Sequence, residues 1–233
     1  MTSASVGSTT VGETTVPADG STAVADGVGG ATLPVAEPPS AVFFAGNPGA
    51  LGVPVFVAGS VALALVLIGY VPPTAVGASI PIIGTATGIG LVIATVWSAA
   101  VGQSAVAAVF GIFAGFWLSY AALVLGLVHD WFAIPLTGLV HTQGLFLITW
   151  LAIIGLLTLV TLRLPAAFTA LFVLIDAALA VLLAATVQGN SDLVKAGGWL
   201  VLAFAAVGAY LFVDIADRAT GGKGVPLGPA LRK

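Results

Sequence analysis

The chain contains no cysteine and very few charged residues. Of its 233 residues only 6% are Asp, Glu, Lys or Arg, whereas 59% are hydrophobic, and the mean hydropathy is +1.17. The absence of cysteine excludes disulfides, thiolate metal sites and cysteine nucleophiles. Because a water-soluble domain normally carries charge on about a quarter of its residues, this composition predicts an integral membrane protein.

Long apolar runs without charge dominate the sequence, and no Asp, Glu, Lys or Arg occurs between Glu37 and Asp130. Roughly 20 apolar residues in a helix cross a hydrocarbon core about 30 Å thick. Runs of this length, separated by prolines and other turn residues, predict six transmembrane helices at 51–71, 78–97, 104–128, 144–162, 166–187 and 197–213. The predicted fold class is therefore an all-α membrane protein, a bundle of six transmembrane helices.

The predicted domain order is an N-terminal tail at 1–41, a membrane domain at 42–216 and a C-terminal tail at 217–233. The first segment lacks aromatic residues, Lys and Arg, which predicts a disordered tail and not a signal peptide. Six spans place both termini on one side. If that side is the cytoplasm, every basic residue except Lys195 faces inward, as the positive-inside rule favours. We therefore expect an integral protein of the cell membrane with cytoplasmic termini.

Signatures of enzymes and of cofactor sites are missing. The sequence contains no nucleophile elbow, phosphate-binding loop or zinc-spaced histidines, so we expect no enzymatic activity, no metal and no cofactor. Six basic residues and a net charge of −3 also argue against nucleic-acid binding. His129 and His141 flank a short loop with Trp131, and we interpret this loop as an interfacial anchor, with a pH sensor as the alternative.

Small residues recur at four-residue spacing in two spans, as Gly84 with Gly88 and Gly111 with Gly115. This spacing lets helix backbones approach closely. Packing within one subunit is the favoured interpretation, and an interface between subunits is the alternative.

Asp176 lies near the middle of the fifth span, where an ionisable group is costly and is a candidate for function. No Lys, Arg or His in the spans can pair with it. It must therefore face water, accept hydrogen bonds from neutral groups or be protonated. Thr169, seven residues earlier, lies on nearly the same helix face. A proton-linked role in a pathway is our hypothesis, and a hydrogen bond between helices is the alternative.

The segment N-P-G-A-L-G-V at residues 47–53 resembles the N-P-A-P-L-G-L signature of the acetate uptake transporter family. Asn47, Pro48, Leu51 and Gly52 carry the match. Further matches in the same order extend the resemblance over residues 47–228: Gly69, Tyr70, Phe116, Trp117, Leu118, Gly198, Trp199, Tyr210 and 225–228.

The resemblance implies a homohexamer of six-helix subunits, each with its own pore for small monocarboxylates and succinate. In that family three bulky side chains form a narrow hydrophobic constriction, and the surrounding motifs place them at Phe56, Phe113 and Ile175. Such a ring can gate a pore by excluding water. Aromatic packing or lipid contact is the alternative for the two phenylalanines.

The chain departs from the family at several positions. The second proline of the signature is Ala50, and polar positions of the family's first two spans are Ala64, Leu67, Leu91 and Ser98. Asn47 remains a candidate for binding substrate through its amide, with a cap at the start of the first span as the alternative.

The function expected from these observations is transport of a small monocarboxylate such as acetate, linked to protons. The predicted partners are the carboxylate, protons, the lipid bilayer and other copies of the chain. Two alternatives stay open. One is a passive channel for ammonia or another small neutral solute, and the other is a membrane scaffold without transport activity.

Overall fold

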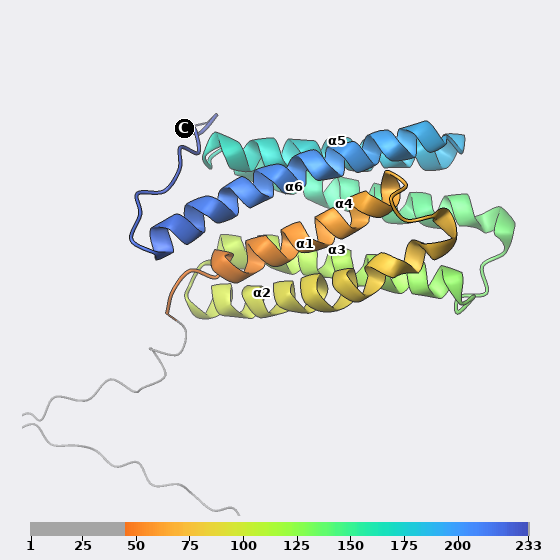
Figure 1. Cartoon of the computed structure of the whole chain (residues 1–233), viewed down its shortest axis with the longest axis horizontal. Coiled ribbons are helices and arrows are strands. Elements are labelled where there is room, and N and C mark those ends of the chain that lie inside the picture. The colour runs from red at the N-terminus through yellow and green to blue at the C-terminus, as the bar shows by residue number, and fades with distance from the viewer. Residues whose placement is uncertain (1–44, 233) are drawn as a thin grey trace, which may run out of the picture. The chain divides into compact units, whose positions relative to one another are not determined.

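A computed structural model describes residues 45–232, and within this range six helical segments are long and apolar enough to cross a bilayer (Figure 1). Five are continuous α-helices: α1 (Gly49–Leu67), α3 (Ser104–Val128), α4 (Leu139–Thr161), α5 (Ala166–Gln188) and α6 (Ser191–Ala219). The remaining span combines η2 (Pro73–Ser79), η3 (Ile82–Ile89) and α2 (Gly90–Ala100). The prediction of an all-α bundle with six spans is confirmed. The predicted tail at 1–41 lies outside the described residues.

Several helix ends differ from the predicted ones. The third span begins and ends as predicted, but α4 begins at Leu139 and not at residue 144, and α6 extends over Ser191–Ala219 and not over 197–213. The side-chain oxygen of Asn190 explains the early start of α6, because it accepts from the backbone N–H groups of Asp192 and Leu193. At its other end α6 continues past residue 216 to Ala219.

The second span is not one regular helix. Pro72 precedes the 3-10 helix η2, which begins at Pro73, and η3 is a π-helix that follows Pro81. Proline lacks a backbone N–H and so interrupts regular helical bonding. Within η3 the hydroxyl of Thr87 donates to the carbonyl oxygen of Val55 on α1, at 2.8 Å. The irregular segment is therefore tied directly to the first helix.

The helices form a ring. Backbones pack closely between α1 and α6, α6 and α5, α5 and α4, α1 and the second span, and the second span and α3. The ring closes between α3 and α4 through aromatic side chains, with Phe116 contacting Phe146 and Trp150 at ring centroid distances of 5.5 Å each. The first residues of α1 and the last of α6 lie at the same end of this ring (Figure 1), which we call the terminal end.

Glycines allow the close helix contacts. A Cβ atom at Gly88 would lie 2.5 Å from Leu118 on α3, and Gly84 also faces α3, at Ala121. Gly111 faces Thr95 on α2, and Gly115 faces Trp150 on α4. Both predicted glycine pairs thus contact neighbouring helices of the same chain.

The segment after α6 folds back over the terminal end of the bundle. Asp214, a buried residue near the end of α6, accepts hydrogen bonds from Nε of Arg218 and from the backbone N–H of Val225. The Tyr210 hydroxyl donates to the carbonyl oxygen of Pro226 at 2.6 Å, and the Leu227 carbonyl accepts from the N–H of Ala167 at the start of α5. The predicted C-terminal tail therefore packs on the membrane domain.

Replacing Asp214 by alanine should release this segment. The change removes the acceptor of the Val225 N–H and the partner of Arg218, so local opening becomes more frequent. We expect trypsin to cut after Lys223 about tenfold faster in Asp214→Ala than in the parent protein, because one hydrogen bond to a charged group is lost. The matched control is Asp192→Ala, which removes an exposed carboxylate at the start of α6. Equal cleavage rates in both variants would contradict this account of the tail.

Candidate functional site

A cavity of about 310 Å³ lies inside the ring of helices. Its walls come from α1, η2, α3, α4, α5 and α6, and they are almost entirely apolar. Gln143, Tyr120, Thr186 and Trp117 provide the polar side-chain groups of the lining, which contains no Asp, Glu, Lys, Arg or His from the described residues. A space of this size can hold a small organic solute.

The cavity occupies one half of the bundle. On α1, α3 and α5, which run away from the terminal end, its lining begins at Phe56, Phe113 and Ile175 and continues toward the C-terminal end of each helix. On α4 and α6, which run the opposite way, it extends from near their N-terminal ends to Ile154 and Phe204. The cavity is therefore a vestibule on the side opposite the terminal end, with its inner end near the middle of the bundle.

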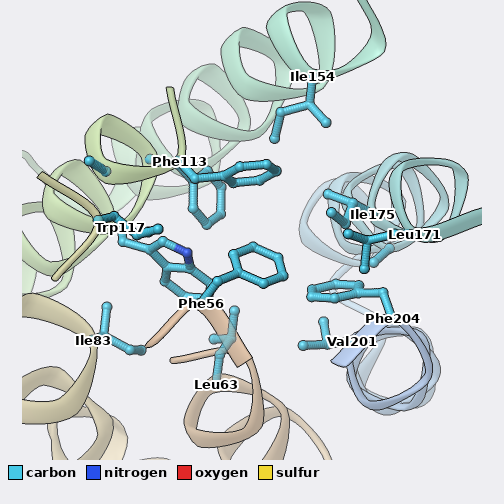
Figure 2. Close-up of a cluster of buried hydrophobic side chains, with 14 of the residues drawn as sticks. Phe56, Leu63, Ile83, Phe113, Trp117, Ile154, Leu171, Ile175, Val201 and Phe204 are labelled. Carbon is cyan, nitrogen blue, oxygen red and sulfur yellow. The ribbon is translucent and has the colours of Figure 1, made fainter. Parts of the chain in front are cut away.

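Phe56, Phe113 and Ile175 all line this inner end. The rings of Phe56 and Phe113 are in edge contact, with centroids 4.9 Å apart, and Phe204 on α6 lies 5.9 Å from Phe56. All three predicted constriction residues are at least nine-tenths buried, and Figure 2 shows them among side chains from several helices that point into the bundle. Apolar side chains in this arrangement exclude water, as hydrophobic gates do.

The signature segment lies at the terminal end, away from the vestibule. Asn47 is exposed, and its Oδ1 accepts from the backbone N–H of Gly49 at 2.9 Å, at the start of α1. Pro48 is fully buried, and Leu51 packs against the core. Gly52 is in contact with the ring of Phe110 on α3. This geometry is that of a helix start and a close helix contact, and substrate binding by Asn47 stays a prediction.

Asp176 faces α4, and it is not among the residues that line the cavity. Its Oδ2 lies 2.6 Å from the Thr158 hydroxyl, which also lies 3.1 Å from the carbonyl oxygen of Ile154. Three residues along α4, the carbonyl of Thr161 accepts from the buried Thr169 hydroxyl at 2.9 Å. Asp176 and Thr169 therefore both connect α5 to α4, on the helix face shared by the two residues.

The Thr158 geometry suits both protonation states of Asp176. With an ionised carboxylate, the Thr158 hydroxyl donates to Oδ2. With a protonated carboxyl, Oδ2–H donates to Thr158, whose own proton then goes to the Ile154 carbonyl. The carboxyl group does not face the cavity, so a proton-linked role for Asp176 stays a hypothesis.

Asp176→Asn should therefore leave the fold intact, since the amide can replace either partner of the Thr158 bond. Thr158→Val, which removes the hydroxyl, should lower stability by about 0.6–1.7 kcal/mol, as for other hydrogen bonds between membrane helices. If Asp176 takes part in proton movement, Asp176→Asn will also change the pH dependence of flux in reconstituted vesicles beyond the dependence set by the titration of acetate itself. Unchanged flux and unchanged pH dependence of flux in this variant would show that Asp176 only forms a contact between helices.

The positions that depart from the family signature mostly lie in packed helix interfaces. Ala64, Leu91 and Ser98 are completely buried and do not line the cavity, whereas Leu67 contributes to its wall. Of the four positions, only Leu67 therefore changes the lining of the vestibule. In the described part of the chain, no three His, Asp or Glu side chains come close enough together to hold a metal ion.

The sequence analysis gave no role in the site to three aromatic residues that shape it, although Trp117 was among the matches to the family. Phe204 packs on Phe56, Trp117 lies 6.2 Å from Phe56 between ring centroids, and Tyr120 lines the vestibule one turn further along α3. Apolar and aromatic residues fill all six spans, so composition alone could not separate pore-lining rings from lipid-facing ones. The spacing of Trp117 and Tyr120 from Phe113, four and seven residues, is the one signal that could have placed them on the same helix face.

Comparison with known proteins agrees with this architecture. Residues 28–220 match the model of the GPR1/FUN34/yaaH family. A solved structure described as that of the bacterial acetate channel SatP is similar to this chain, with a TM-score of 0.69 and 21% sequence identity over 79% of this chain and 99% of that one. Among curated protein sequences, none matches significantly.

Proposed function

This chain belongs to the GPR1/FUN34/yaaH family, and from that premise we propose that it carries acetate or a similar small monocarboxylate across the membrane. The observation that carries the proposal is the apolar vestibule that ends at Phe56, Phe113 and Ile175. The similar fold of a protein described as an acetate channel supports the choice of solute. The vestibule lies within a single chain, which supports one pore per subunit of the proposed homohexamer.

The lining favours passage of the neutral acid. It provides no Lys or Arg from the described residues to stabilise an anion, and an isolated charge in an apolar space is costly. A carboxylic acid that crosses in its protonated, neutral form, or a carboxylate that accepts hydrogen bonds from donors along the route, avoids most of this cost. Movement of the neutral acid also carries a proton with each solute molecule, which is the proton linkage that we propose.

Proteoliposomes test this function directly. Protein purified and reconstituted into vesicles should take up labelled acetate much faster than protein-free vesicles, and unlabelled propionate should compete. The termini should lie on the cytoplasmic side in the cell, as their basic residues favour. Acetate uptake equal to that of protein-free vesicles would overturn the proposal.

A passive pore for ammonia or another small neutral solute is the second candidate, and the same lining favours it because it contains no carboxylate from the described residues. Uptake of labelled acetate driven by an imposed pH difference separates the two. A chain that carries acetic acid speeds the accumulation of acetate to the level that the pH difference sets, whereas a pore that passes ammonia leaves acetate uptake at the rate of protein-free vesicles.

A further inference from the structure

Trp117 on α3 carries a hydrogen-bond donor that has no partner in the structure. The residue is only 1% exposed, and its indole Nε1 is buried without an acceptor among the described residues. Buried indole N–H groups usually find an acceptor, because leaving one unpaired costs free energy. An unpaired donor of this kind therefore calls for a specific explanation.

The position of Trp117 suggests that explanation. It lines the inner end of the vestibule, its ring centroid is 6.2 Å from that of Phe56, and Phe56 in turn contacts Phe113 at 4.9 Å. In Figure 2 the indole nitrogen lies on the side of the ring that faces this group. The donor is thus placed at the level of the constriction, and the surrounding rings cover it while the constriction is closed.

The chemistry of the indole selects the kind of solute that it can bind. Its N–H only donates a hydrogen bond and accepts none, so it suits an acceptor such as a carboxyl oxygen. The edges of the neighbouring rings also carry partial positive charge. In a lining without Lys, Arg or His from the described residues, these are the groups that favour a carboxyl oxygen.

We propose that the indole N–H of Trp117 donates to a carboxyl oxygen of the solute as it passes Phe56, Phe113 and Ile175. The proposal rests on the function given above, in which the vestibule is the route of a small carboxylic acid. Thr186, Gln143 and Tyr120 provide the other polar side-chain groups of the lining. Gln143 lies near the N-terminal end of α4, and Tyr120 lies three residues from Trp117 on the same face of α3.

The test removes the donor without changing the shape of the ring. Tryptophan 117 is replaced by 3-benzothienylalanine, in which sulfur stands in place of the N–H, and acetate flux is measured in proteoliposomes over a range of concentrations. We expect flux at low acetate concentration to fall about tenfold, the factor that corresponds to one lost hydrogen bond. Trp117→Phe, which also lacks the donor, should show a loss at least as large.

The matched control is the same replacement at Trp150, which packs on Gly115 outside the cavity lining. It should leave acetate flux unchanged, and thermal unfolding should show that both proteins are folded. If the parent protein carries acetate and the benzothienyl replacement at position 117 does not reduce its flux, Trp117 is not a donor to the solute, although the transport function stands. If the parent protein carries no acetate, the transport function fails first and this inference falls with it.

Discussion

Phe113→Ala is expected to raise the flux of larger monocarboxylates, such as butyrate, at least about tenfold, which corresponds to a barrier lower by about 1.4 kcal/mol. The Phe113 ring closes the inner end of the vestibule against Phe56. Its removal widens the constriction and lets water enter, and both effects ease the passage of a bulkier acid. Flux of labelled butyrate and acetate in proteoliposomes measures the change in selectivity.

Phe172→Ala is the matched control for this experiment. Phe172 is as deeply buried as Phe113 and contacts it at a centroid distance of 5.7 Å, but it does not line the cavity. Both variants lose a buried ring, which typically costs about 3–5 kcal/mol of stability. Effects on flux that come only from this loss of folding stability should therefore be the same in both. A similar change of selectivity in both would contradict the role of Phe113 in the constriction.

Gly59→Ala is expected to destabilise the protein by about 1–3 kcal/mol, the usual cost of overpacking. A Cβ atom at this position would lie 2.4 Å from the Thr87 hydroxyl oxygen. That hydroxyl holds the π-helix η3 to the Val55 carbonyl of α1. The added methyl group therefore pushes the second span away from the first, and thermal unfolding in detergent should show a midpoint lower by roughly 2–10 °C.

Gly155→Ala on α4 provides the control, because no atom lies within 4 Å of the position that its Cβ would occupy. Alanine favours the helix over glycine by about 1 kcal/mol, so this variant should be as stable as the parent or more stable. Equal destabilisation by both substitutions would show that the close contact at Gly59 does not hold these helices together.

The sequence was sufficient to predict the six-helix architecture, because each segment that crosses lipid must be long and apolar by itself. Charge-free runs of about 20 residues have few alternatives to a transmembrane helix, and the span at 104–128 was placed to the residue. The ends of α4 and α6 were less well predicted because polar residues inside a helix looked like loop residues. For α6 the signal was present: Asn190, followed by Ser191 and Asp192, is a typical helix start.

The candidate site was only partly predictable. The resemblance placed Phe56, Phe113 and Ile175, and the structure brings them together at the inner end of one cavity. The partner of Asp176 could not be foreseen, since the contact with Thr158 depends on how α4 and α5 pack. The unpaired donor of Trp117 was equally hidden, because only three-dimensional packing reveals whether an indole N–H has an acceptor.

The vestibule is the proposed route of the solute. Because the sequence contains no cysteine, single introduced cysteines can test this route directly. Thr186→Cys places a thiol in the cavity lining, and Val187→Cys places one on the exposed surface beside it. Both are treated with a charged thiol reagent from the side opposite the termini, and acetate flux in proteoliposomes is compared before and after. We predict that modification at position 186 blocks most of the flux and that modification at position 187 does not; complete labelling at position 186 with undiminished flux would contradict the account.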